Sequence, residues 1–261
     1  MKKHPTSNIQ HPVPKPSDAG RALDVECSML DVGCFPTSQN WLLLNSGSCN
    51  AAFNMALDEA LLEAMPRLGK PVLRFYGWTE PAATFGYFQK FAEVERATHL
   101  RPLIRRPTGG GIVPHDADWT YSLAFPTNHE WYSLKAIESY RRAHEWIQRA
   151  FAKLNVATEL AHAAKSGIPG ACFAGYEKSD VLWRGRKIAG AAQRRNKLGL
   201  LIQGSVQPPL LALTRTDWDQ AMLDSAPDAA WSELGQDAAL RQRAEELSLC
   251  KYSQADYNRK R

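Results

Sequence analysis

Residues 105–116 read Arg-Arg-Pro-Thr-Gly-Gly-Gly-Ile-Val-Pro-His-Asp, and they stand between an apolar Leu103-Ile104 pair and a strand-like run over 119–125. The three consecutive glycines lack a Cβ atom and permit positive φ, so the backbone here can lie directly against a ligand. The flanking side chains supply two cations, a hydroxyl, an imidazole and a carboxylate. The stretch therefore predicts one wall of a binding site, while a glycine-rich hairpin or bulge is the equally simple alternative.

The composition is that of a globular chain. Its 261 residues suit one large domain, or one domain with tails, and 44% of them are hydrophobic. The net charge of +5 suits an acidic protein partner or a phosphate-bearing substrate. No basic stripe with stacking aromatics predicts nucleic-acid binding, and no apolar run predicts a membrane span. Neither a Gly-Lys-Ser/Thr phosphate loop nor a dinucleotide fingerprint occurs, which disfavours ordinary ATPases and dinucleotide enzymes.

The cysteines are odd in number and scattered, at positions 27, 34, 49, 172 and 250. They form no Cys-x-x-Cys pair, so neither a disulfide framework nor a zinc site is expected. The first residues lack the apolar core of a signal peptide, and acidic residues argue against an organelle presequence. A reducing cytoplasm is the expected location.

Periodicity divides the chain into a domain and two tails. Residues 1–38 are rich in proline, serine, histidine and lysine without any period, and we expect a flexible tail. Residues 39–250 carry the periodic segments and form the predicted domain. Residues 251–261 are polar and are expected to fray as a C-terminal tail.

The periodic segments predict strands and helices in irregular order. Strands are expected near 41–45, 72–76, 82–87 and 119–125, with two or three more in 181–206. A helix over 51–65 is expected to begin at Ser48 or Asn50 and to end at Pro66 and Gly69. A long amphipathic helix over 133–154 carries one apolar face, which includes Ile137, and residues 217–250 show a charged helical pattern. This order predicts an α+β fold with a mixed or antiparallel sheet.

Lys187 and Cys172 are the residues best suited to acyl or phosphoryl chemistry. Lys187 lies beside a run of small residues, where a ligand could approach the backbone and a cation could reach its oxygen. Cys172 lies in a loop before that strand, and a thiolate attacks thioesters readily. The alternatives are an exposed strand lysine and a small buried cysteine.

The histidines offer weaker signals. His115 and Asp116 are adjacent in a strand and point to opposite faces, so they form no dyad by themselves, and one of them is expected to orient the loop. His144 and His162, on or near the long helix, are expected to be surface or capping residues.

Four ordered segments between about Trp41 and Val206 resemble the superfamily of lipoate–protein ligases, octanoyltransferases and biotin ligases. Residues 54–61 resemble its first helix, and residues 73–78 with 85–89 resemble the next strands. Residues 105–116 resemble the acyl-binding signature, and residues 185–193 resemble the strand that bears the family lysine. The Gly-Arg-Gly-Arg signature of biotin ligases is missing, which favours lipoyl-type chemistry.

The resemblance implies a fold and a set of site residues. The fold would be α+β, a large mixed β-sheet with surrounding helices and a tunnel for an eight-carbon acyl chain, and residues 39–250 would be its catalytic domain. Cys172 and Lys187 would be catalytic, and no metal site is implied. The substrate-binding residues would be Arg74, Arg106, Thr108, Gly109, Gly110, Gly111, His115, Gly190, Ala191, Ala192 and Gln203.

The resemblance leaves three functions open. An octanoyltransferase takes octanoyl from octanoyl-acyl carrier protein without a cofactor, and one subfamily uses a cysteine shortly before the lysine strand. Cys172 lies 15 residues before Lys187 and resembles that cysteine. A ligase activates lipoate with ATP and Mg²⁺, and a non-catalytic subunit would only bind acyl groups or lipoyl domains. The acceptor would be a lysine of a lipoyl-domain protein, such as glycine cleavage H protein or the E2 subunit of a 2-oxoacid dehydrogenase.

One position departs from the family pattern. The family often has Gln-His-Gly-Ser before its last core strand, and here Gln203 stands at the position of the histidine. Glutamine can form hydrogen bonds but cannot take a proton, so base catalysis from this position is not expected.

Overall fold

The computed structural model describes residues 39–166, 173, 175–226 and 229–261. The predicted tail over 1–38 and Cys172 lie outside these residues. The strands are β1 (Gln39–Cys49), β2 (Val72–Trp78), β3 (Ala82–Phe85), β4 (Leu103–Arg105), β5 (Val113–His115), β6 (Trp119–Phe125), β7 (Glu159–Leu160), β8 (Val181–Trp183), β9 (Arg186–Asn196), β10 (Gly199–Val206) and β11 (Ala229–Glu233). The helices are α1 (Ala51–Leu68), α2 (Phe91–Ala97), α3 (Glu130–Ser133), α4 (Ala136–Lys153), α5 (Arg215–Asp224), α6 (Ala238–Leu247), the π-helix η1 (Ser248–Tyr252) and α7 (Ala255–Arg259).

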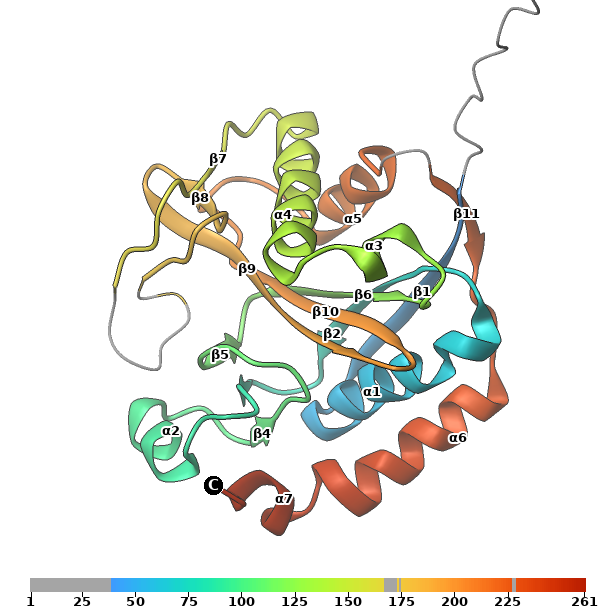
Figure 1. Ribbon diagram of the computed structural model, residues 1–261. Coiled ribbons are helices and arrows are strands. Elements are labelled where there is room, and N and C mark those ends of the chain that lie inside the picture. Colours follow the sequence, from blue (N-terminus) through green and yellow to red (C-terminus); the bar gives the residue numbers. More distant parts are fainter. Residues whose placement is uncertain (1–38, 167–172, 174, 227–228) are drawn as a thin grey trace, which may run out of the picture. The chain divides into compact units, whose positions relative to one another are not determined.

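A mixed sheet dominates the fold (Figure 1). Its strand order within the described residues is β11-β1-β2-β6-β10-β9-β8-β7, and a separate small sheet has the order β4-β3-β5. Strand β1 is parallel to both β2 and β11, whereas β6, β10, β9 and β8 are antiparallel to their neighbours. Helices surround the sheet, so the predicted α+β class with a large mixed sheet is confirmed.

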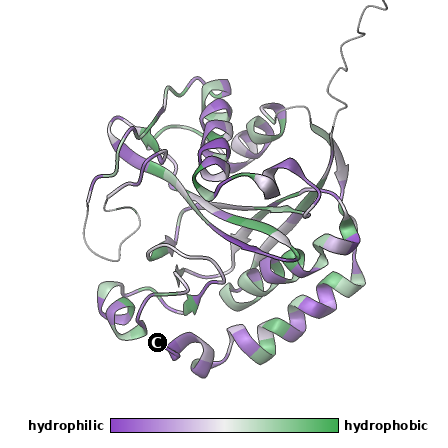
Figure 2. Cartoon of the chain, viewed as in Figure 1, coloured by the Kyte–Doolittle hydropathy of each residue, from purple (hydrophilic) through white to green (hydrophobic). Residues whose placement is uncertain are grey.

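Each face of the sheet buries its own apolar cluster. Strand β2 shows the alternation, because Leu73 and Phe75 pack with α4 and α5, while Val72 and Tyr76 pack with α1 and α6. Helix α6 has one face on the protein and one in solvent. For this reason hydrophilic and hydrophobic residues alternate along it (Figure 2). Residues of the small sheet and of β9 and β10 together line one pocket.

Helix α1 begins as predicted and ends later than predicted. The Asn50 side chain accepts a hydrogen bond from the Phe53 backbone N–H at 2.9 Å, which caps the first turn. The helix continues through Pro66 to Leu68, so the expectation that Pro66 ends it was wrong. Proline forgoes one backbone bond, whereas Gly69, at φ 62°, turns the chain and returns its N–H to the Met65 carbonyl at 3.0 Å.

Three other boundary predictions also need correction. The helix predicted over 133–154 is α4, but it begins three residues later, at Ala136, after the separate short helix α3. Ile137, predicted on the apolar face, is 61% exposed in the first turn of α4. Residues 229–233 form the edge strand β11 rather than helix, and a half-exposed edge strand carries little alternation. The last residues do not fray, since buried Asn258 accepts from the Arg105 backbone N–H at 2.8 Å and anchors α7.

His144 is buried on α4, not at the surface as expected. Its ring meets Tyr140 edge-on at 4.2 Å between centroids, and neither ring nitrogen has a hydrogen-bond partner. Burial lowers the pKa of His144 from 6.5 to about 4. The helical spacing could have revealed this, because His144 lies four residues after Tyr140 and three before Ile147, on the apolar face of the helix.

This burial predicts a pH-dependent stability. The unfolded chain binds a proton at His144 below about pH 6.5 and the folded chain only below about pH 4, so stability is lost as pH falls through this window. The loss reaches about 3 kcal/mol. Urea unfolding of wild type and His144→Phe between pH 4 and 7 should show a shallower pH slope in the variant. The exposed His99→Phe should keep the wild-type slope, and equal slopes in all three proteins would refute the prediction.

Candidate active site

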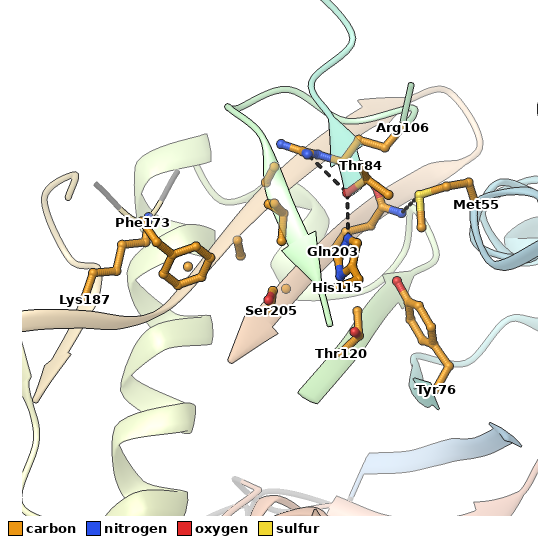
Figure 3. A pocket seen from close by; sticks show the side chains of 15 residues that line it. Met55, Tyr76, Thr84, Arg106, His115, Thr120, Phe173, Lys187, Gln203 and Ser205 are labelled. Atoms are coloured by element: carbon orange, nitrogen blue, oxygen red, sulfur yellow. Dashed lines mark hydrogen bonds between the residues drawn. The ribbon is translucent and has the colours of Figure 1, made fainter. Parts of the chain in front are cut away.

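A narrow pocket, with about 40 Å³ of space that a water-sized sphere can enter, lies where β9 and β10 of the large sheet face the small sheet (Figure 3). Helix α1 contributes only Met55, and the loops contribute Arg106 and Phe173. The other lining residues come from strands: Tyr76, Thr84, Val113, His115, Thr120, Lys187, Gly190, Ala191, Ala192, Gln203, Gly204 and Ser205.

Lys187 is held at the pocket wall. Its Nζ lies 2.7 Å from Asp180 Oδ2, and the lysine side chain is only 6% exposed. The Asp180 carboxylate also accepts from the Tyr140 hydroxyl and from the Glu177 backbone N–H. Lys187 is therefore a fixed cation beside the Phe173 ring, not an exposed strand lysine.

Gly190 makes room for this lysine. A Cβ atom at position 190 would stand 2.7 Å from Lys187 Nζ and 2.6 Å from its Cε. The Lys187 side chain therefore lies against the backbone of its own strand at Gly190, three residues further along the chain. This explains the glycine at position 190.

Gln203 is fixed at both ends of its amide. Its Oε1 accepts from Thr108 Oγ1 at 2.7 Å, and its Nε2 donates to Asp58 Oδ2 at 2.7 Å. Thr108 itself does not line the pocket but holds Gln203 there. This pairing assigns the amide orientation, since a carboxylate can only accept.

Asp58 is the buried hub behind the pocket. It accepts from Gln203, from Arg74 Nη1 at 2.7 Å, from Ser122 Oγ at 2.7 Å and from the Tyr76 hydroxyl at 3.0 Å. Arg74, predicted to bind substrate, does not line the pocket, because its guanidinium is used by Asp58, Asn54 and Ser46. Arg74 binds Asp58, and Asp58 in turn accepts hydrogen bonds from Tyr76 and Gln203, which line the pocket.

His115 belongs to a second polar cluster. Its Nδ1 lies 2.9 Å from Asp118 Oδ2 and its Nε2 lies 2.8 Å from Thr84 Oγ1. The ring is stacked on Trp78 at 3.8 Å between centroids. The partner is Asp118, three residues on, and not the adjacent Asp116, which is exposed. The sequence analysis missed Asp118, although a His-x-x-Asp spacing across a turn could have drawn attention to it.

Comparison with known proteins identifies the family to which this chain belongs. The family model for the lipoyl protein ligase A/B catalytic domain matches residues 50–208, which include every lining residue of the pocket. The chain belongs to this family. The resemblance predicted from residues 41–206 is thereby confirmed.

Several curated relatives are named octanoyltransferase LipM. Octanoyltransferase LipM of Carboxydothermus hydrogenoformans is 36% identical over 174 residues, which cover 64% of this chain and 65% of the relative. Octanoyltransferase LipM of Bacillus subtilis is 36% identical over 185 residues, with 64% and 65% covered. The chain thus spans just under two thirds of the length of these relatives.

Solved structures share the fold. A lipoate-protein ligase A bound with ATP superposes with a TM-score of 0.69 at 21% identity, covering 85% of this chain and 98% of the ligase. Protein Ta0514 of T. acidophilum with bound lipoic acid gives 0.70 at 20% identity, covering 86% and 100%. At this identity the likeness establishes the lipoate-ligase fold alone.

The glycine run of this family member does not line the pocket. Gly109, Gly110 and Gly111 lie beside it, where the Gly109 carbonyl accepts from Arg106 Nε at 3.0 Å. Gly110 has φ 86°, and a Cβ on Gly86 would stand 1.9 Å from the Gly110 carbonyl oxygen. The described contacts therefore show two backbones in close approach. Arg106, Val113 and His115 are the members of the stretch over 105–116 that line the pocket.

The predicted site residues thus fall into three groups. Seven line the pocket: Arg106, His115, Lys187, Gly190, Ala191, Ala192 and Gln203. Arg74, Thr108 and the three glycines lie beside or behind it, and Cys172 lies outside the described residues. Among those residues, no group of three or more His, Cys, Asp or Glu side chains could hold a metal ion. In the same part of the chain, no helix has the length and apolarity to cross a membrane.

Proposed function

We propose that the protein transfers an octanoyl group from octanoyl-acyl carrier protein to a lysine of a lipoyl-domain protein, through an acyl-enzyme on Cys172. Octanoyl transfer is the activity named for its LipM relatives. The observation that carries the proposal is the buried Lys187 cation beside a largely apolar pocket. An acyl chain gains about 0.8 kcal/mol for each CH₂ group that it buries, and a fixed cation stabilises the oxyanion at its head.

The residues suggest the order of events. The Cys172 thiolate attacks the thioester carbonyl, and the carrier thiol leaves with the proton that the cysteine lost. Lys187 Nζ, held by Asp180, stabilises the negative oxygen of the tetrahedral intermediate. The acceptor lysine then attacks the acyl-enzyme and releases Cys172. Phe173, the chain neighbour of Cys172, lines the pocket, which supports a reaction at this position.

The partners and location follow from the same proposal. The acceptor is a lipoyl-domain protein, such as glycine cleavage H protein or the E2 subunit of a 2-oxoacid dehydrogenase. No cofactor is needed for a thioester donor. Cys49 and Cys250 are free in the described part of the chain, which fits a reducing cytoplasm.

An ATP-dependent lipoate ligase is the second candidate. The fold is that of a lipoate-protein ligase solved with ATP, and Lys187 could equally contact a carbonyl and a phosphate oxygen. Such an enzyme would need ATP and Mg²⁺ and would form lipoyl-AMP.

One mass-spectrometric experiment separates these functions. After incubation with octanoyl-acyl carrier protein, the intact chain should gain about 126 Da, the mass of one octanoyl group on a thiol. A parallel incubation with ATP, Mg²⁺ and lipoate or octanoate should release no pyrophosphate. Pyrophosphate release without the adduct would establish the ligase instead. Neither reaction, with retained binding of acyl groups, would indicate a non-catalytic subunit.

A further inference from the structure

We infer that His115, oriented by Asp118 and reached through the Thr84 hydroxyl, accepts the proton that the acceptor lysine must lose. The inference rests on one part of the proposed function, namely that the acceptor is a lysine of a lipoyl domain. It does not depend on the donor, because a thioester and an acyl-adenylate are both attacked only by a neutral amine. A lysine side chain has a pKa of about 10.4 and is an ammonium at neutral pH. It cannot attack a carbonyl until a base has removed one proton.

Few groups at the pocket could be that base. Among the described lining residues, the titratable side chains are Tyr76, Arg106, His115 and Lys187. Burial raises the pKa of Tyr76 well above its usual value, and its hydroxyl already donates to Asp58. Arginine stays protonated in proteins, and Lys187 is engaged as a cation by Asp180. Gln203, at the position of the family histidine, cannot take a proton. The imidazole of His115 remains.

The hydrogen bonds place the lone pair of His115 toward the pocket. Asp118 can only accept, so Nδ1 carries the hydrogen and donates to Asp118 Oδ2. In the neutral ring, Nε2 is then an acceptor, and Thr84 Oγ1 donates to it at 2.8 Å. Thr84 and His115 both line the pocket, and the Trp78 stack holds the ring in this orientation. The arrangement matches the order of groups in a hydrolase triad, with a hydroxyl, an imidazole and a carboxylate.

Asp118 is built to stabilise the imidazolium that would form. Its side chain has no exposed surface, and its Oδ2 also accepts from Thr120 Oγ1 at 2.9 Å and Ser205 Oγ at 2.7 Å. Its second oxygen, Oδ1, is buried without a partner. A buried carboxylate with spare acceptor capacity favours a positive charge beside it.

The same contacts bring the imidazole near the acyl carbonyl site. Lys187 Nζ lies over Gly190, and Gly190 is paired across the sheet with Ser205. Ser205 donates to Asp118, which holds His115. Lys187 and His115 thus line one pocket and are linked through this series of contacts, and an acyl carbonyl beside Lys187 would share that pocket with an incoming amine.

The proton movements balance in both steps. The acceptor ammonium passes one proton to Thr84 Oγ1 as the Thr84 proton moves to His115 Nε2, which leaves a neutral amine and an imidazolium. The amine attacks the acyl carbon, and collapse of the intermediate forms the amide and breaks the C–S bond. The departing thiolate takes the second proton of the nitrogen. The imidazolium then releases its proton to solvent, so one proton is set free for each amide formed.

The test uses the full chain, acylated with octanoyl-acyl carrier protein and freed of donor. Transfer to an isolated lipoyl domain is timed in a single turnover, and transfer to hydroxylamine, an amine that is largely neutral at pH 7, is timed in parallel. His115→Gln should slow transfer to the lipoyl domain about 100-fold. The same variant should be slowed far less toward hydroxylamine, so the ratio of the hydroxylamine rate to the lipoyl-domain rate should rise about 30-fold or more. A variant that is slowed equally toward both amines would overturn the proposal.

Matched variants test the rest of the relay. Thr84→Val should slow transfer to the lipoyl domain about tenfold or more, whereas Thr84→Ser, which keeps the hydroxyl, should not. Asp118→Asn should resemble His115→Gln, and the exposed neighbour variant Asp116→Asn should match wild type. Wild-type speed in Asp118→Asn would count against the relay. If the wild type makes no acyl-enzyme, the proposed function fails by itself, and the same comparison is then run with the octanoyl-adenylate as donor.

Discussion

Cys172→Ala is expected to abolish the octanoyl adduct of about 126 Da while leaving the fold intact. Alanine differs from cysteine only by the missing sulfur atom, which is the atom that would carry the acyl group. None of the described side chains that line the pocket is a thiol. Lys187 is paired with Asp180 and is therefore not expected to carry the acyl group. The measurement is the intact mass after incubation with octanoyl-acyl carrier protein, together with transfer to a lipoyl domain.

Two other cysteines provide matched controls for this substitution. Cys49 is partly buried in β1 and Cys250 is exposed in η1, and neither lines the pocket. Cys49→Ala and Cys250→Ala should both acquire the adduct at the wild-type rate. Transfer by Cys172→Ala at the wild-type rate would show that the acyl group never resides on this thiol. Lipoyl-AMP formation, in contrast, would be insensitive to the substitution.

The substitution Lys187→Met tests the proposed role of Lys187 as oxyanion stabiliser separately from the role of Cys172 as nucleophile. Methionine keeps most of the length of the side chain and removes the charge. The adduct should still form on Cys172, because the thiol is unchanged, but about 100-fold more slowly. Stopped samples analysed by intact mass would show a full final yield with a delayed time course.

Arg74→Met is expected to lower the free energy of unfolding by about 3–5 kcal/mol, the cost of leaving a buried charge without its partner. Arg74 and Asp58 have no exposed side-chain surface, and their charged atoms lie 2.7 Å apart. Asp58 would keep its bonds from Ser122, Tyr76 and Gln203 but would lose its only cation in this network. Urea unfolding monitored by tryptophan fluorescence gives the free energy.

A second salt bridge of the chain is the control for this prediction. Arg67 lies 2.6 Å from Asp237, but its side chain is 53% exposed. Water solvates both charges there, so Arg67→Met should change the free energy of unfolding by less than about 1 kcal/mol. Equal effects of Arg67→Met and Arg74→Met would show that Asp58 gains nothing from its burial beside Arg74.

Much of the pocket could be predicted from motifs, since the segments around Lys187 and His115 carried family patterns. The partners of Lys187 could not. Asp180 and Tyr140 are ordinary polar residues in the sequence, and they reach Lys187 only once α4 has packed against β9. Asp118, three residues after His115, was within reach of a local pattern. Arg74 illustrates the reverse case, because a motif position suggested substrate contact while its buried neighbours engage the guanidinium.

The sequence by itself determined the α+β class, the run of strands over 181–206 and the membership of a lipoyl-ligase family. These features rest on periodicity, turn residues and the order of motifs, which are local along the chain. The tertiary structure alone decided that the glycine run stands beside the pocket and that Thr108 and Asp58 hold Gln203. These outcomes depend on distances between segments far apart in sequence, and hydrogen-bond geometry and burial exist only once those segments have packed together.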